Sequence, residues 1–321
     1  MRTCVNFFGW LAVTATLCGE PSVAPNRPLA PWPPAAGTLR VIVDTDAANE
    51  VDDQWAIALA LGFPERLKIE GFVAAHYGQR GGARGLERSR ASLEETLVAA
   101  GAKGKFPLRN GSDPLIYRDR LPQSEGVEFI LETARTATPE NPLWLVLLGP
   151  ATDAAVALLK EPAIADRMVV FWHGRSTWPD RCTNFNATND PVGAQLLFEL
   201  PCRLVLFDTG ANLTMPMPES ERRVGTVGAL GKFLHRIRLG SAYASRDDKG
   251  IFDLGDIAAL VDPALITSEV TAAPGVRFDL SYDFSREYGR IVRIPSIDRD
   301  RSFILLDQAL ARLTRETSDV R

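Results

Sequence analysis

Short apolar runs alternate with helical patterns along most of the chain. The apolar runs predict strands over residues 40–44, 69–75, 143–148, 168–173 and 203–207. Helical patterns predict helices over residues 53–62, 84–101, 124–136, 151–160, 191–199 and 221–239, and a last helix over 299–315. Residues 277–282 and 290–294 are expected to pair as strands. This alternation predicts an α/β fold, with a mainly parallel sheet covered by helices on both faces.

The first 37 residues differ from this pattern. Residues 1–20 contain a mostly apolar stretch, too short to span a bilayer, which predicts a secretory signal and no integral membrane segment in the mature chain. Residues 21–37 are rich in proline, which predicts a stiff linker rather than a packed element. No second linker follows, so we expect a single domain over residues 38–321. The leader favours export to the periplasm or the medium; a tail on a cytoplasmic protein is the alternative.

Composition and charge narrow the function classes. Of the 321 residues, 45% are hydrophobic and 24% are charged, as in globular proteins. A formal net charge of −4 without a basic run gives no general attraction to nucleic acid. The three histidines show no zinc-ligand spacing and there is no CxxC, so a zinc site is not expected. Cys182 and Cys202 would be free to pair in an exported protein if the fold brings them together.

An acidic run follows the first predicted strand. Asp44, Asp46, Glu50, Asp52 and Asp53 lie within ten residues. So much negative charge repels itself unless something offsets it, and the usual offset is a hard divalent cation held by oxygen ligands. Open α/β sheets bind ligands at the C-terminal ends of their strands, where these carboxylates are expected. The ordinary alternative is a solvated acidic turn with a helix cap.

Two later segments add polar candidates. The turn at 149–153 ends a predicted strand, and one of its carbonyls is able to ligate a hard cation. The long loop after residue 173 carries Trp178, Asn184 and Asn186. Amides hydrogen-bond hydroxyl groups, and a tryptophan face stacks on a sugar or a base. This loop is therefore interpreted as a ligand-binding segment.

Two carboxylates and two histidines complete the candidate site. Asp253 and Asp256 precede an apolar helix and, three residues apart, are able to face the same way; a double helix cap is the ordinary explanation. His76 and His173 follow apolar strands at the presumed ligand-binding end of the sheet. They are interpreted either as structural histidines or as groups that contact a substrate or donate a proton to a leaving group.

Taken in order, these segments resemble the inosine–uridine-preferring nucleoside hydrolase family from about residue 40 to about residue 315. The family opens with Asp-x-Asp-Pro-Gly-x-Asp-Asp, continues with a Gly-x-x-Thr-Asn turn and with Glu-Phe-Asn before Asp-Pro, and ends with His-Asp before a second Asp-Pro. The matching segments here are 44–53, 149–153, 184–191 and 252–263. Four matches in the same order make the resemblance fairly specific.

The resemblance implies a Rossmann-like nucleoside hydrolase fold and Ca²⁺-dependent hydrolysis of the N-glycosidic bonds of ribonucleosides. Carried over by position, the cation ligands would be Asp46, Asp53, the carbonyl of Thr152 and Asp253. Asp46 would also be the general base that activates a water molecule. The candidate substrate contacts are Asp52, His76, His173, Trp178, Asn184 and Asn186. Because family members are commonly dimers or tetramers, the resemblance also points to a homo-oligomer.

The chain departs from the family pattern where sugar and leaving group are recognised. Asn184 replaces a Glu, Phe252 replaces a His that acts as leaving-group acid, and His76 follows a strand where a ribose-binding Asn is usual. Five residues, instead of three, separate Asp46 from Asp52. These departures leave two alternatives: an altered relative that binds a riboside or another sugar, and a hydrolase of a non-nucleoside glycoside. A phosphohydrolase is a third, because a strand followed by Asp-x-Asp also begins haloacid-dehalogenase-like enzymes.

Overall fold

The structure is a computed structural model that describes residues 27–319, with side chains up to residue 315. The predicted leader over residues 1–20 and the start of the predicted linker, residues 21–26, lie outside the described residues. Within the described part, no helix combines the length and the apolar character needed to cross a membrane.

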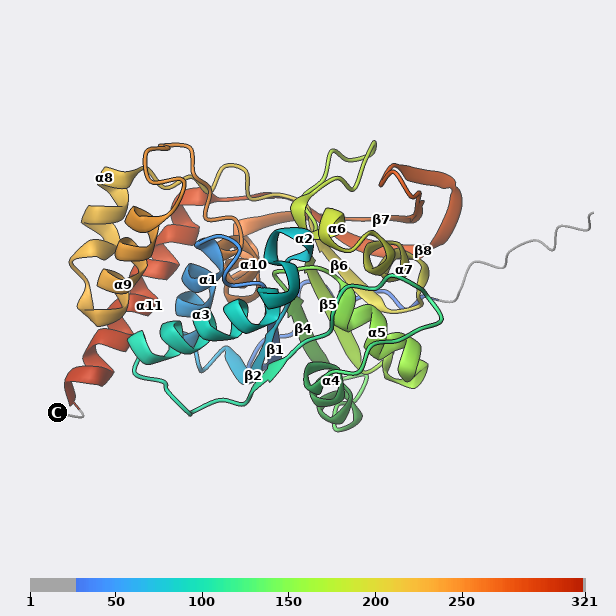
Figure 1. The fold of residues 1–321 in the computed structure, drawn as a ribbon, viewed down its shortest axis with the longest axis horizontal. Coiled ribbons are helices and arrows are strands. Elements are labelled where there is room, and N and C mark those ends of the chain that lie inside the picture. Colours follow the sequence, from blue (N-terminus) through green and yellow to red (C-terminus); the bar gives the residue numbers. More distant parts are fainter. Residues whose placement is uncertain (1–26, 320–321) are drawn as a thin grey trace, which may run out of the picture.

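A single eight-stranded sheet forms the centre of the described chain, in the order β3-β2-β1-β4-β5-β6-β8-β7 (Figure 1). Its strands are β1 Leu39–Thr45, β2 Leu67–Ala74, β3 Leu108–Asn110, β4 Leu143–Leu147, β5 Met168–His173, β6 Arg203–Phe207, β7 Ile266–Val276 and β8 Tyr282–Ile297. All neighbouring pairs are parallel except β7 and β8. The mainly parallel α/β fold predicted from the sequence is therefore confirmed.

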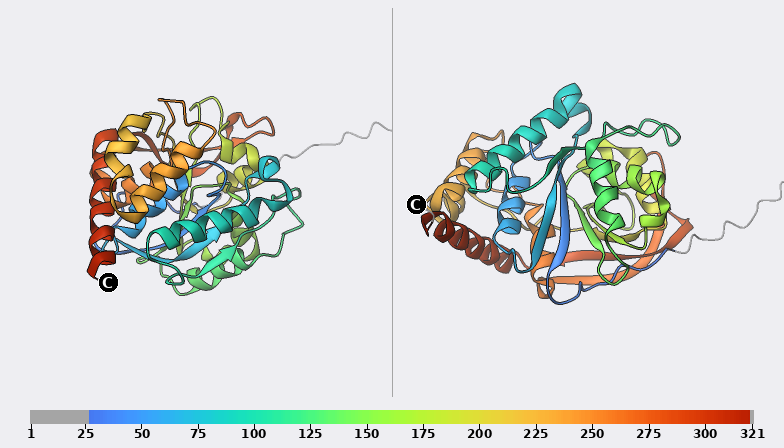
Figure 2. Two further views of the ribbon diagram at one scale, coloured as in Figure 1. Left: turned by 60° about the vertical axis from the view of Figure 1, so that its left-hand side comes forward. Right: turned by 90° about the horizontal axis from the view of Figure 1, so that it is seen from below.

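Helices cover both faces of the sheet (Figures 1 and 2). On one face lie α1 Asp52–Leu61, α3 Gly85–Ala99, α9 Gly228–Gly240, α10 Leu254–Val261 and α11 Arg299–Asp319; on the other lie α4 Glu125–Arg135, α5 Thr152–Lys160 and α7 Pro191–Glu199. The shorter helices are α2 Gly78–Gly81, α6 Phe185–Asn189 and α8 Met217–Ser220. Because both faces of the sheet are covered, its central strands β4 and β5 are buried throughout, and apart from His173 at the end of β5 they are apolar.

Two predicted elements differ from the structure. The strand expected over residues 277–282 lies instead at Ile266–Val276, where polar residues on an edge strand hid the apolar signal. The helix expected over 221–239 is divided: a π-helical turn covers Glu221–Gly225, and α9 begins at Gly228. Gly228 has φ of +57°, a left-handed conformation that interrupts a right-handed helix and suits glycine.

The described part of the predicted linker packs against the domain. Arg27 is buried, and its guanidinium donates hydrogen bonds to the carbonyls of Phe198 (2.5 Å) and Cys202 (3.0 Å). The ring of Trp32 lies 5.8 Å from that of Phe171, between ring centroids. The prediction of an unpacked linker is therefore wrong for residues 27–34. Cys182 and Cys202 are both buried free thiols, so the disulfide considered for them is not formed.

Candidate active site

A pocket of about 270 Å³ lies beyond the C-terminal ends of β1, β4 and β5. Parallel pairing brings these three strand ends to the same edge of the sheet, so residues far apart in sequence meet there. Of the residues singled out from the sequence, the pocket is lined by Asp46, Asp52, Asp53, His173, Asn184, Asn186 and Asp253. The structure thus brings together most of the predicted site.

The acidic side chains of the pocket form a buried group of oxygen donors. Asp52, Asp53 and Asp253 each place a carboxylate oxygen within 4.8 Å of the others. Burial, reinforced by the charge of Asp52, raises the pKa of Asp53 to about 7. Burial and neighbouring carboxylates also raise the pKa values of Asp46 and Asp253 well above the usual range. Among the described residues, Asp46 Oδ2 is buried without a hydrogen-bond partner. A hard cation fits this donor set, because it would supply the missing partner and offset the repulsion.

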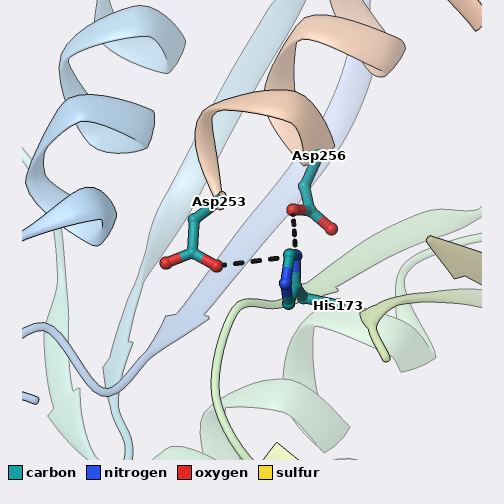
Figure 3. A group of neighbouring side chains, drawn as sticks. All are labelled: His173, Asp253 and Asp256. Atoms are coloured by element: carbon teal, nitrogen blue, oxygen red, sulfur yellow. Dashed lines mark hydrogen bonds and ion pairs between the residues drawn. The ribbon is translucent and has the colours of Figure 1, made fainter. Parts of the chain in front are cut away.

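A histidine and two carboxylates adjoin this acidic group (Figure 3). The Nδ1 atom of His173, at the end of β5, lies 2.7 Å from Asp256 Oδ2 and 3.6 Å from Asp253 Oδ1. Burial opposes a charge on His173, but the carboxylate of Asp256 outweighs it and the pKa of the imidazole is raised. Burial raises the pKa of Asp256 to about 6, despite the histidine. His173 is therefore held by an ion pair beside the acidic group.

The two asparagines of the long loop line the pocket and also fasten the loop. The Nδ2 group of Asn186 donates to the carbonyls of Leu148 (2.8 Å) and His173 (3.0 Å), which ties the loop to the ends of β4 and β5. Asn184 caps α6, because its Oδ1 accepts from the backbone N–H of Ala187 (2.8 Å). The Oδ1 of Asn186 is the side-chain atom that these bonds leave for a ligand.

Thr152 and His76 lie outside the pocket in a buried network. The N–H of Gly78 donates to His76 Nδ1 (3.0 Å), so Nε2 carries the proton and donates to Thr152 Oγ1 (2.7 Å). Thr152 in turn donates to Asp190 Oδ2 (2.5 Å). Burial lowers the pKa of His76 to about 4, so the ring is neutral. Neither Thr152 nor His76 lines the pocket. In the turn after β4, the residue that lines it is Leu148.

Trp178 also lies outside the pocket. Its ring packs against Tyr282 and Phe284, with centroids 4.8 and 5.4 Å apart, and the guanidinium carbon of Arg293 lies 5.1 Å from its ring. The structure therefore gives Trp178 a packing role at the start of β8, in place of the ligand stacking expected from the sequence.

Two residues near the site, Arg175 and Lys249, were not singled out from the sequence. Glu50 Oε2 lies 2.7 Å from Lys249 Nζ, and Asp52 Oδ1 lies 3.4 Å from the same amine. Burial opposes the charge of Lys249, but Asp52 and Glu50 raise its pKa. Arg175 lines the pocket on the loop after β5. No spacing rule could have found Lys249, because it meets Asp52 from 197 residues away.

An α/β sheet whose strand ends carry a buried set of oxygen donors defines a protein able to hold a metal ion and a small polar substrate in this pocket. The chain belongs to the inosine-uridine preferring nucleoside hydrolase family, because the model of that family matches residues 41–303. It is therefore a hydrolase that acts on the N-glycosidic bonds of nucleosides. The family expected from the motifs is confirmed.

Solved structures of low sequence identity share the fold. The chain is similar to a plant nucleoside hydrolase, with 20% identity, a TM-score of 0.69, and coverage of 85% of this chain and 99% of that one. The chain is also similar to a purine-preferring ribonucleoside hydrolase from Gardnerella vaginalis, with 20% identity, a TM-score of 0.66, and coverage of 86% of this chain and 99% of that one. For an inosine-uridine preferring nucleoside hydrolase from Bacillus anthracis the identity is 15%, the TM-score is 0.61, and coverage is 86% of this chain and 100% of that one. No curated protein matches the sequence.

The network behind the pocket carries the first prediction, for Asp190→Ala. This change removes the acceptor for the N–H groups of Gly193 (2.7 Å) and Leu115 (3.0 Å) and for Thr152. Because these buried donors lose their partner, we expect the free energy of unfolding in urea to fall by about 2–4 kcal/mol.

The matched control is Asp262→Ala, a second Asp-Pro cap, which accepts from the N–H of Ala264 (3.0 Å) and pairs with Arg301 nearer the surface. There we expect a loss of about 1 kcal/mol or less. An equal loss in the two variants would contradict the structural role of Asp190.

Proposed function

We propose that the protein is a Ca²⁺-dependent hydrolase of ribonucleosides in which Asp46 is the general base. The observation that carries this proposal is the buried group of carboxylate oxygens in the pocket, in which Asp46 Oδ2 has no partner among the described residues. Hard oxygen donors without nitrogen or sulfur suit Ca²⁺. The family match supports the N-glycosidic bond of a nucleoside as the bond that is cleaved.

In this proposal the cation ligands come from three segments. Asp46 and Asp53 follow β1, and Asp253 precedes α10. The turn after β4 would contribute a backbone carbonyl. Leu148 is better placed for this than Thr152, because Leu148 lines the pocket and Thr152 does not.

The residues of the pocket divide the chemistry among them. A bound Ca²⁺ would lower the pKa of a coordinated water and orient it. Asp46 would accept the proton of the attacking water as its oxygen bonds to C1′ and the C1′–N bond breaks. Asp52 would accept a hydrogen bond from a ribose hydroxyl, since the backbone N–H of Phe252 (3.1 Å) and Lys249 hold its carboxylate. The neighbouring carboxylates would stabilise the oxocarbenium-like transition state.

Attack by water on the face opposite the base would invert the configuration at C1′, as in inverting glycosidases. The set Asp46, Asp53 and Asp253 is complete in the pocket, which favours turnover over a relative that only binds sugar. The membership of the chain in a nucleoside hydrolase family likewise disfavours a phosphohydrolase.

The experiment that tests the proposal measures ribose release by the purified full chain. Purine and pyrimidine ribosides are supplied with Ca²⁺, and parallel reactions contain a chelator. Ribose release that the chelator stops and added Ca²⁺ restores is the expected result. A folded protein that releases no ribose from any riboside, with Ca²⁺ present, would refute the proposed activity.

The raised carboxyl pKa values predict how stability depends on pH. Asp53 titrates near pH 7 in the folded protein and near 3.9 when unfolded. The folded protein therefore binds more protons than the unfolded chain between these values, and without cation it loses stability as pH rises through 7. We expect the melting temperature without Ca²⁺ to fall by about 5 °C between pH 5 and pH 8.

Saturating Ca²⁺ replaces the protons as counter-charge, so the Ca²⁺-induced increase in melting temperature should be larger at pH 8 than at pH 5. The variant Asp53→Asn removes one titrating group and should flatten the pH dependence without Ca²⁺. A Ca²⁺ effect that is larger at pH 5 would contradict the assignment.

A further inference from the structure

Arg175 is a cationic side chain in the wall of a pocket that is lined by several carboxylates. Its backbone is held on both sides: Gly174 N–H donates to the carbonyl of Phe207 (3.1 Å), and Ser176 N–H donates to Asp208 Oδ1 (2.6 Å). Its guanidinium carbon lies 4.7 Å from the ring centroid of Phe252. The loop and the ring together keep this charge at the pocket.

The charge of Arg175 is not neutralised by a carboxylate. In the described part of the chain no ion pair or hydrogen bond of its guanidinium is found; it contacts the ring of Phe252, and its charge acts against the protonation of the neighbouring His173. The other cation near that ring, Lys249, lies 4.6 Å from the centroid but is paired with Glu50 and Asp52. Arg175 is thus available to a ligand in a way that Lys249 is not.

Most other nitrogen donors of the pocket have partners. The Nδ1 of His173 is held by Asp256, and the side-chain N–H groups of Asn184 and Asn186 bond to backbone carbonyls. The Nε2 of His173 is not used by this ion pair, but its charge is offset by Asp256, whereas the charge of Arg175 has no carboxylate partner among the described residues. The acidic side of the pocket suits water, cation and ribose hydroxyls, but it repels a group that becomes negative. Cleavage of C1′–N leaves the bonding electron pair on the base, so the departing group is the part of the substrate that needs a cation.

We propose that Arg175 is the catalytic residue that stabilises the leaving group. As C1′–N breaks, the electron pair passes to the ring nitrogen and is delocalised onto a carbonyl oxygen of the base, to which the guanidinium donates hydrogen bonds. The water oxygen bonds to C1′, Asp46 takes the water proton, and the released base anion takes a proton from solvent. The inference rests on the proposed function and extends it to bases whose anion places charge on an oxygen.

The test compares two substrates that need different help at the leaving group. The base of inosine, hypoxanthine, is a poor leaving group as an anion, whereas 4-nitrophenyl riboside releases a 4-nitrophenolate that is stable without a partner. For Arg175→Met we expect kcat/KM to fall about 100-fold with inosine, mainly through kcat, and less than about 3-fold with 4-nitrophenyl riboside. Arg175→Lys keeps the charge and should recover part of the loss.

The matched control is Arg181→Met, on the same loop but paired with Asp180 and Asp279 and outside the pocket lining; we expect unchanged rates with both substrates. Melting temperatures of all variants check the fold. Equal losses on both substrates, or no loss, would overturn the role of Arg175. If wild type hydrolyses inosine 5′-monophosphate faster than inosine, and Arg175→Met removes that preference, Arg175 binds a phosphate instead and the inference is overturned. A wild-type protein that releases no ribose from any riboside refutes the proposed function itself.

Discussion

Replacement of Asp46 by asparagine is expected to lower kcat for ribonucleoside hydrolysis about 1000-fold or more while the protein stays folded. General-base catalysis contributes about 10²–10⁴-fold, and the amide can no longer accept the proton of the attacking water. The side chain keeps its size, so the packing of the pocket is preserved. Burial and the charges of Asp53 and Asp52 raise the pKa of Asp46, so a neutral group in its place is tolerated.

For the same reason the melting temperature of Asp46→Asn without Ca²⁺ should equal or exceed that of the wild type. Ribose release under saturating nucleoside and Ca²⁺ gives kcat, and calorimetry gives the melting temperature. The exposed residue Asp113 provides the control, because Asp113→Asn makes the same chemical change outside the pocket. A wild-type rate in Asp46→Asn would remove Asp46 from the role of general base.

Replacement of Asp253 by asparagine is expected to weaken Ca²⁺ binding about 100-fold. Asp253 shares the acidic group with Asp52 and Asp53, and an amide oxygen is a weaker ligand for a hard cation than a carboxylate. By linkage, a 100-fold larger dissociation constant reduces the free energy with which bound Ca²⁺ stabilises the fold by about 2.7 kcal/mol. The Ca²⁺-induced increase in melting temperature should therefore shrink by roughly 5 °C.

Asp256→Asn is the matched control for this prediction. Asp256 lies three residues further along the chain and contacts His173 (Figure 3). It is not part of the group formed by Asp52, Asp53 and Asp253. We expect this variant to keep most of the Ca²⁺ effect. If Asp256→Asn loses the Ca²⁺ effect as fully as Asp253→Asn does, the cation lies instead in the second group, formed by His173, Asp253 and Asp256. Titration calorimetry with Ca²⁺ measures both affinities directly.

The position of Lys249 explains how the fold tolerates one departure from the family pattern, the longer segment between Asp46 and Asp52. The segment between Asp46 and Asp52 is two residues longer than usual and brings an additional carboxylate, Glu50, to the pocket. Unpaired, Glu50 would add to the repulsion among the acidic side chains. Its 2.7 Å contact with the buried amine of Lys249 offsets that charge, and the same amine lies 3.4 Å from Asp52. The longer loop and Lys249 are therefore complementary.

The class of fold and the position of the site were predictable from the pattern of residues along the chain. Central strands that are covered on both faces are apolar over most of their length, so β1, β4 and β5 each contain an apolar run. The acidic residues after β1 mark the ligand-binding end of the sheet for a similar reason: so many carboxylates in a short segment need a counter-charge. Local composition carries both signals.

Which side chains face the pocket was not predictable in this way, because it depends on long-range contacts in the folded chain. Whether a turn offers Leu148 or Thr152, and whether a loop offers Arg175 or Trp178, depends on partners that come from elsewhere in the chain. Thr152 is drawn to Asp190 behind the pocket, and Trp178 to Phe284 on β8. A side chain takes the orientation that satisfies its hydrogen bonds and buries its apolar surface, and those partners are fixed only when the whole sheet has assembled.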